Sequence, residues 1–275
     1  MVPGSPAVGS LLICATPIGN PGDITLRVLD ALADADLVAC EDTRRTGALL
    51  AQHGIRAQLV SLNEQSERAK APALVARIAA GETVAVVSDA GTPLLSDPGY
   101  APVRECIAAG LPVKVLPGAS AALAALVASG LPCERFRFVG FLPRGQRELL
   151  AALDGPETQV AFESPRRLAA SLAALAAQEP LRALVVCREL TKTHEETLRG
   201  SAQELAEHFA RVEPLGEITL VAAGREPRRA ELDTALAVLE ELVAAGVKPR
   251  AGARAIARLT GLSANELYRA RTAGL

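Results

Sequence analysis

Polar and turn-forming residues gather directly after three of the apolar runs in this chain of 275 residues. The three clusters are "ATPIGNPGDIT" (15 to 25), "SDAGTPLLSDPG" (88 to 99) and "LPGASAAL" (116 to 123). Glycine lets a ligand approach the backbone closely, and the free N–H groups at the start of a helix can bind an acceptor. We therefore expect the three turns to form one pocket for a small molecule.

Each cluster taken alone also has an ordinary structural explanation. Pro-Gly and Asp-Pro-Gly are common turn formers, and Ser120 suits the N-cap of the alanine-rich helix that follows it. Asp23 and Asp97 are interpreted as caps for the same reason. Asp89 differs because it stands directly at the end of an apolar strand, and we expect it to hydrogen bond a ligand.

Two common nucleotide-binding motifs are missing from the sequence. The chain has no G-x-x-x-x-G-K-[ST] phosphate loop, and no G-x-G-x-x-G follows its first strand. We expect no metal site, because the three histidines are not placed to complete one. The five cysteines are far apart and odd in number, and we interpret them as reduced core thiols: Cys14, Cys40, Cys106, Cys133 and Cys187.

Alternating strands and helices must position the turns. We expect the first strands at 10–16, 37–40, 57–62, 84–88 and 113–116, with helices near 25–34, 44–53, 66–80 and 98–109. Such alternation predicts a mainly parallel sheet covered on both faces. Ligands bind beyond the carboxyl ends of such strands, where the three turns fall.

A second set of elements favours a mixed sheet, because neighbouring strands have short connections. Its strands are expected at 136–141, 158–163, 182–187, 195–200 and 217–224, with helices near 119–129, 166–177 and 201–210. Helices alone follow, near 230–245, 249–259 and 263–270, with Ser263 as a cap. We divide the chain into an N-terminal α/β domain (1–116), a second α/β domain (117–225) and a helical, basic appendage (226–275).

Composition limits the class of protein. A hydrophobic fraction of 49% and a formal charge of -2 are typical of a globular protein, so any site for a polyanion must be local. No run approaches the about 20 apolar residues of a membrane helix, and the start lacks a charged segment followed by an apolar one. We expect a cytoplasmic protein that has no membrane partner.

Longer motifs carry a resemblance. The chain contains "ATPIGNPGDITLRVLDALADADLVACEDTRRT", "VSDAGTPLLSDPGY", "PGASAALAALVASGLPCERFRFVGFLPR", "FESPRRL" and "CRELTKTHEET". In this order they resemble the ribosomal RNA small subunit methyltransferase I family, a branch of the tetrapyrrole methylase fold. The resemblance implies S-adenosylmethionine as methyl donor, the ribose 2′-hydroxyl of a cytidine in small-subunit (16S) ribosomal RNA as acceptor, and a homodimer.

The resemblance also assigns residues to the site. Carried over by motif, the donor is met by Ile18, Gly19, Asp89, Thr92, Ser120 and Ala121. A general base must remove one proton, and Glu41 and Glu163 are candidates because each ends a strand in a family-like motif. Each candidate also has a structural alternative. For Glu41 the alternative is that it caps the following helix together with Asp42. For Glu163 it is that the carboxylate pairs with Arg166 or Arg167.

RNA binding requires local cations. Arg44, Arg144, Arg166 and Lys192 lie in the matching motifs, in loops or first helical turns where they can contact phosphates. The appendage is also basic, which suits either RNA docking or dimer packing. Aromatic residues make up only 3% of the chain, so we expect recognition by shape and phosphates, in the assembled ribosomal subunit.

Two other functions compete with this hypothesis. A methylase of a small tetrapyrrole would share the fold but needs no basic appendage. A non-catalytic ribosome-assembly factor would use the fold only for binding, and need not bind S-adenosylmethionine.

Overall fold

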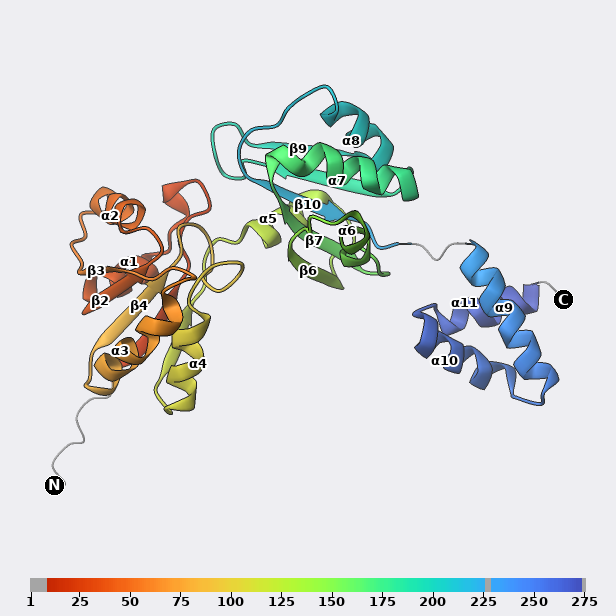
Figure 1. Ribbon diagram of the computed structural model, residues 1–275, viewed down its shortest axis with the longest axis horizontal. Coiled ribbons are helices and arrows are strands. Elements are labelled where there is room, and N and C mark those ends of the chain that lie inside the picture. Colours follow the sequence, from red (N-terminus) through yellow and green to blue (C-terminus); the bar gives the residue numbers. More distant parts are fainter. Residues whose placement is uncertain (1–8, 226–228, 274–275) are drawn as a thin grey trace.

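The first sheet brings the ends of its strands to one edge. The structure, a computed structural model, describes residues 9–225 and 229–273 (Figure 1). All pairs in this sheet are parallel and the strand order is β3-β2-β4-β1-β5. The strands are β1 (Ser10–Cys14), β2 (Leu37–Cys40), β3 (Leu59–Ser61), β4 (Thr83–Val87) and β5 (Val113–Leu116).

Helices cover both faces of this sheet, which is why its central strands are apolar throughout. α1 (Leu26–Asp34) and α2 (Thr43–Gln52) pack on one face, and α3 (Glu67–Ala79) and α4 (Tyr100–Ala108) on the other. Because side chains alternate along a strand, Leu12 faces α1 while Leu11 faces α3.

The second sheet is mixed, as predicted, with the order β6-β7-β10-β8-β9. Its strands are β6 (Phe136–Phe141), β7 (Thr158–Glu163), β8 (Ala183–Arg188), β9 (Glu196–Ser201) and β10 (Ile218–Ala222), and only β6 and β7 pair in parallel. α5 (Ala121–Ser129) packs on one face. α6 (Gln146–Ala152), α7 (Pro165–Gln178) and α8 (Ala202–Phe209) cover the other.

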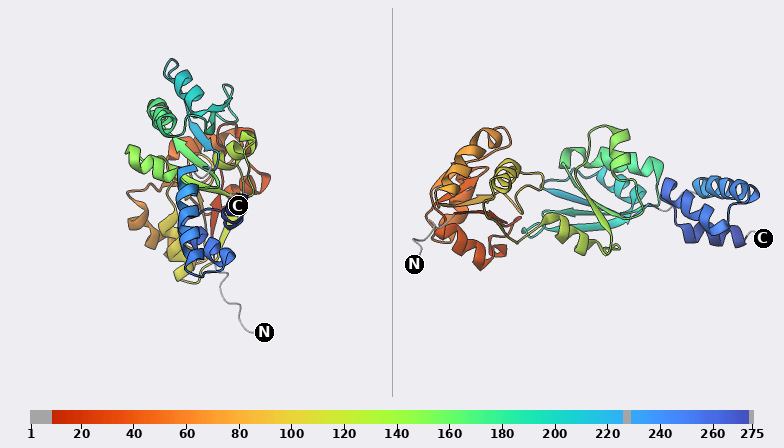
Figure 2. Two further views of the ribbon diagram at one scale, coloured as in Figure 1. Left: turned by 90° about the vertical axis from the view of Figure 1, so that its right-hand side faces the viewer. Right: turned by 90° about the horizontal axis from the view of Figure 1, so that it is seen from below.

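The appendage forms a separate helical unit with its own core. α9 (Arg229–Ala244), α10 (Pro249–Thr260) and α11 (Ala264–Ala273) pack around Leu239, Ile256 and Leu267. Ser263 Oγ accepts from the N–H of Glu266 at 3.3 Å, as its predicted capping role requires. The unit lies at the opposite end of the long axis from the first sheet (Figure 2).

The α/β class, the parallel first sheet and the mixed second sheet are confirmed. The capping role predicted for Asp97 is wrong: α4 begins after Gly99, at φ 125, and the N–H of Gly99 donates to Glu67 Oε2 at 2.7 Å. Asp23 ends a short 3-10 turn (Pro21–Asp23) whose N-cap is Asn20.

The interpretation of all cysteines as core thiols is wrong for Cys133, which is exposed in a loop, while the other four are buried. Burial raises the pKa of Cys14 to about 12, so this thiol stays protonated. Within residues 9–225 and 229–273, no helix is both long and apolar enough to span a bilayer.

Candidate functional site

Backbone hydrogen bonds bring the three predicted turns together. Gly91, at φ 76, follows β4 and exchanges two hydrogen bonds with Thr16 after β1: Thr16 N–H donates to Gly91 O at 2.8 Å, and Gly91 N–H to Thr16 O at 3.1 Å. The hydroxyl of Thr92 donates to the carbonyl of Ala119 at 3.4 Å, which ties in the turn before α5. The turns therefore form one continuous surface at the carboxyl edge of the first sheet.

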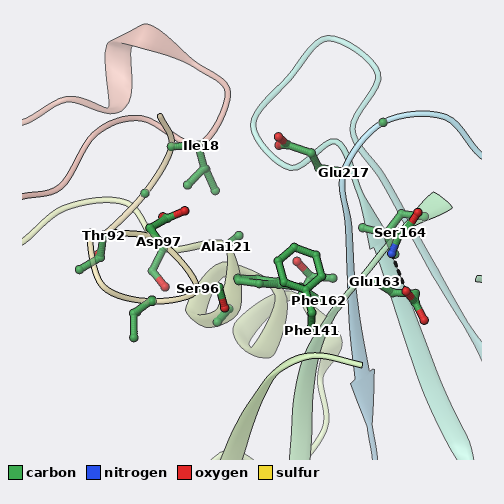
Figure 3. Close-up of a pocket in the computed structure, with 18 of the residues that line it drawn as sticks. Ile18, Thr92, Ser96, Asp97, Ala121, Phe141, Phe162, Glu163, Ser164 and Glu217 are labelled. Carbon is green, nitrogen blue, oxygen red and sulfur yellow. Dashed lines mark hydrogen bonds between the residues drawn. The ribbon is translucent and has the colours of Figure 1, made fainter. Parts of the chain in front are cut away.

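This surface is one wall of a cavity of about 300 Å³ (Figure 3). Ile18, Thr92 and Asp97 line it from the first domain, and the start of α5 supplies Ser120 and Ala121. The opposite wall comes from the second sheet, where Phe141 and Phe162 pack edge to face with their ring centroids 5.5 Å apart. We call this space the first cavity.

A second cavity, of about 310 Å³, adjoins the first. Its charged lining consists of Arg45, Asp89, Lys192 and Glu217. The two cavities share three residues, which are Ile18, Ala90 and Glu217. A ligand in one cavity therefore meets a ligand in the other at these residues.

The predicted donor residues divide between the two cavities. Ile18, Thr92, Ser120 and Ala121 line the first cavity, whereas Gly19 and Asp89 line the second, and Ile18 lines both. Ser120 also caps α5 by accepting from the N–H of Leu123 at 3.4 Å, which confirms its predicted capping role.

Asp89 is held by protein groups on both carboxylate oxygens. Its Oδ1 accepts from the N–H of Asp42 at 3.1 Å, and its Oδ2 lies 3.2 Å from a guanidinium nitrogen of Arg45. These contacts connect the end of β4 to the start of α2. Asp89 thus braces the wall of the second cavity.

The carboxylate of Glu163 is bound by three neighbouring protein groups. Its carboxylate accepts from Ser164 N–H at 2.6 Å and from Ser171 Oγ at 2.5 Å, and it pairs with Arg167 at 2.5 Å. The side chain is fully buried, and Figure 3 shows its carboxylate turned away from Ile18 and Asp97. Of the two predicted partners, Arg166 and Arg167, the structure pairs Glu163 with Arg167. This geometry disfavours Glu163 as a base.

Glu41 lines neither of the two cavities. Burial, and then the nearby charge of Asp89, raise the pKa of its half-buried carboxyl. The N-cap of α2 is Asp42 rather than Glu41, since Asp42 Oδ1 accepts from the N–H of Arg44 at 2.9 Å. Hydrogen bonds from Arg44 hold the pKa of Asp42 well below its usual range.

The four predicted RNA-binding cations are not gathered in one place. Arg44 is 89% exposed and pairs with Asp42. Arg166 is exposed at the start of α7, and Arg144 lines a separate groove beside Arg167. Lys192 is different, because its ammonium already has two carboxylate partners, Glu189 and Glu217.

Sequence reasoning missed several residues of the cavity walls. Phe141 and Phe162 stand at or near the ends of their strands, a position that could have drawn attention in a chain with few aromatics. Asp97 faces the first cavity, where burial, and then the charge of Glu41, raise its pKa to about 6. The signal for Glu217 was only a Gly-Glu pair before an apolar strand.

No group of three His, Cys, Asp or Glu side chains in the described ranges could hold a metal ion.

Comparison with known proteins identifies the family and agrees with the fold. The family model of the tetrapyrrole (corrin/porphyrin) methylases matches residues 10–206. Solved structures agree in fold: diphthine synthase has a TM-score of 0.60 at 17% identity and covers 78% of this chain and 90% of its own. Uroporphyrin-III C-methyltransferase of Thermus thermophilus, titled as complexed with S-adenyl homocysteine, has a TM-score of 0.56 at 21% identity and covers 78% and 97%. The chain belongs to the tetrapyrrole methylase family.

Closer relatives narrow the assignment. A protein of Mycobacterium tuberculosis (strain ATCC 25618 / H37Rv) named ribosomal RNA small subunit methyltransferase I is 48% identical over 268 residues, which cover 94% of this chain and 93% of that protein. A protein of the same name from Escherichia coli O157:H7 is 41% identical over 271 residues, covering 95% and 94%. Within the tetrapyrrole methylases, the chain therefore belongs to the ribosomal RNA small subunit methyltransferase I family and is a methyltransferase.

Proposed function

We propose that this methyltransferase transfers a methyl group from S-adenosylmethionine to the ribose 2′-hydroxyl of a cytidine in 16S ribosomal RNA. The observation that carries the proposal is a sequence identity of 41% to 48%, over nearly the full chain, with relatives named ribosomal RNA small subunit methyltransferase I. The pair of adjoining cavities supports it, because a donor and an acceptor need separate spaces that meet at one point.

The first cavity fits the donor. Phe141 is 59% exposed and, with Phe162, offers an apolar surface of the kind that suits a nucleobase. Thr92, Ser96 and Asp97 offer hydroxyl and carboxyl groups to a polar ligand. A Cβ at Gly91 would lie only 3.3 Å from Ile18 Cγ2, so glycine keeps this wall open.

S-adenosylmethionine supplies a methyl group already activated on a sulfonium. The chain must hold the acceptor oxygen in line with the methyl carbon, exclude water and accept one proton. Such positioning contributes roughly 7 to 11 kcal/mol in well-oriented systems. Walls from both domains serve this purpose, and the contact between Asn20 N–H and Thr191 Oγ1 at 3.0 Å joins the domains beside the second cavity.

RNA would bind along the exposed cations outside the cavities. Arg44, Arg144 and Arg166 present guanidinium groups to solvent and suit phosphate contacts. In the appendage, Arg250, Arg254 and Arg258 are exposed at four-residue spacing along α10, a row that suits an RNA backbone. We propose the assembled small subunit as substrate, since a row of cations at the far end of the molecule needs an extended, folded partner.

We propose a homodimer that acts in the cytoplasm. Support for the dimer comes from apolar side chains exposed near the junction of the domains. Val115 on the edge strand β5 and Leu123 and Val127 on α5 are all more than half exposed. Sedimentation of the full chain tests this, and a monomer at micromolar concentration would contradict it.

The decisive experiment compares ribosomal RNA from cells with and without this gene. Mass spectrometry of RNA fragments should locate one ribose methyl that is present only when the gene is. Purified protein with S-adenosylmethionine should restore it on subunits from the deleted cells. If the fragments are identical, calorimetry with S-adenosylmethionine shows whether the chain still binds the donor, as a methyltransferase that acts on another acceptor would.

A further inference from the structure

Glu217 occupies the boundary between the two cavities. It precedes β10 and is one of the three residues that line both spaces, together with Ile18 and Ala90. Of these three, only Glu217 carries a side chain that can accept a proton. Figure 3 shows it on a loop of the second domain, projecting toward Ile18 across the cleft.

The neighbours of Glu217 leave one carboxylate oxygen available. Its Oε2 lies 3.0 Å from Lys192 Nζ. Among residues 9–225 and 229–273, no hydrogen bond to its Oε1 is found, and the side chain is 68% exposed. A ligand that bridges the cavities would cover this exposed oxygen.

A local scaffold fixes the position of this residue. Glu189 Oε1 accepts from the backbone N–H of Glu217 at 2.9 Å and also from Lys192 at 2.7 Å. Gly216 has φ 88, and a Cβ there would lie 2.3 Å from Glu189 Cδ, so only glycine fits beside this carboxylate. The scaffold holds the backbone and one oxygen of Glu217 and leaves the other oxygen facing the cleft.

Other carboxylates near the cleft are less suitably placed. Glu163 is turned into the second domain with three partners. Both oxygens of Asp89 contact protein groups, and Glu41 lines neither cavity. Asp97 lines only the first cavity, on the donor side of the boundary.

We infer that Glu217 is the general base of the methyl transfer, an inference that rests on the proposed function. As the acceptor oxygen forms its bond to the methyl carbon, the carbon–sulfur bond breaks and sulfur keeps the electron pair. The hydroxyl proton passes to Oε1 of Glu217, so charge and atoms balance. Lys192 is a positioning residue that orients this carboxylate.

Lys192 forms ion pairs with both Glu189 and Glu217. Burial lowers the pKa of Lys192, but its hydrogen bonds to Glu189 and Glu217 outweigh burial and raise it, so the ammonium stays charged. This charged ammonium holds Oε2 of Glu217 in an ion pair at 3.0 Å. The titratable and charged groups that line the two cavities with Glu217 are Lys192, Asp89, Arg45, Asp97 and Glu163, and Glu189 binds its backbone N–H.

The test uses the full chain, tritiated S-adenosylmethionine and small subunits from cells that lack the gene. Glu217→Gln keeps the shape and removes the proton acceptor, so the single-turnover rate should fall by about 10²- to 10⁴-fold. Donor affinity by calorimetry and subunit affinity by filter binding should each stay within threefold. Glu213→Gln, in the same exposed loop, is the matched control and should retain the rate.

A second variant separates chemistry from folding. Glu217→Ala should lower the single-turnover rate to the same extent. Added formate should restore part of the rate, because it can occupy the space of the missing carboxylate. A rate for Glu217→Gln within threefold of the unmodified chain overturns the inference, as does a loss explained by weaker donor binding. If the unmodified chain itself transfers no methyl group to these subunits, the proposed function fails instead.

Discussion

Asn20 and Thr191 join the two domains although 171 positions separate them in the chain, with the N–H of Asn20 donating to Thr191 Oγ1 at 3.0 Å. Thr191 stands in the loop between β8 and β9 at φ 67, a backbone conformation that threonine rarely adopts. Its own N–H donates to Glu195 Oε2 at 2.6 Å, which holds the loop in this shape. The loop thereby spans the cleft beside the second cavity.

Thr191→Val removes this hydroxyl and keeps the branched side chain. We expect donor affinity to fall by about threefold to tenfold, since the net value of one hydrogen bond is about 0.5–1.5 kcal/mol. Calorimetry with S-adenosylmethionine measures the change. Thr193→Val, at an exposed position of the same loop, is the control. Equal affinity in both variants would mean that the contact does not contribute to the closed cleft.

Asp89→Ala should weaken donor binding through the wall that Asp89 braces. The substitution leaves the N–H of Asp42 and the guanidinium of Arg45 without their acceptor and loosens the loops around Ile18 and Ala90. We expect a loss of about three- to tenfold in donor affinity by calorimetry. Asp30→Ala, on the exposed side of α1, serves as the control. Unchanged affinity would show that the wall braced by Asp89 does not contribute to donor binding.

Much of the fold follows from the sequence because the strands are buried on both faces. Val84 to Val87 read as one apolar run, and the polar residues after it mark the edge where ligands bind. The boundary residue Glu217 could not be predicted in this way, since its role depends on the meeting of a loop before β10 with a turn after β1. The helix α6 was missed because seven residues give too few turns for a periodic pattern.

The role of Asp97 also depended on tertiary context. A carboxyl between Pro and Ser in a turn looks like a cap, yet here the Glu67 side chain binds the start of α4 instead. Asp97 is left in the wall of the first cavity, where burial, and then the charges of Glu41 and Asp89, raise its pKa. Local sequence does not show that Glu67, 30 positions before Asp97, accepts the hydrogen bond at the start of α4 that was predicted for Asp97.

The raised pKa of Asp97 predicts a specific pH dependence of stability. The pKa of Asp97 is about 6 in the folded chain against an ordinary value of 3.8, so the folded state binds more protons between these pH values. The contribution of Asp97 to stability therefore decreases as pH rises from about 4 to about 6, then stays constant. Asp97→Asn should raise Tm at pH 8 relative to the unmodified chain and leave it nearly unchanged at pH 4.

Scanning calorimetry at the two pH values measures this difference without any ligand. Asp30→Asn removes one carboxylate at an exposed helical position and serves as the control. A Tm of Asp97→Asn that is lower than that of the unmodified chain at pH 8 would show that the ionised carboxylate is stabilised by its surroundings, against the raised pKa.

The appendage makes the remaining prediction. Removal of residues 226–275 should weaken binding to the small subunit and leave donor affinity unchanged, since both cavities are lined only by residues between Pro17 and Thr219. The core of α9, α10 and α11 is self-contained, so its loss should not unfold the two sheets. Unchanged subunit binding would assign the appendage to another role, such as packing between copies of the chain.

A charge reversal on α10 tests the phosphate contacts more directly. Arg254 and Arg258 are exposed one turn apart, whereas Arg271 pairs with Glu240 at 3.0 Å and Arg250 stacks over Tyr268 at 5.2 Å. The double variant Arg254→Glu and Arg258→Glu should lower subunit affinity and reduce the slope of log K against log salt by about 1 to 2. Arg27→Glu with Arg68→Glu, exposed on the first domain, makes the same change of net charge. If both double variants lose equal affinity, net charge rather than the α10 row controls binding.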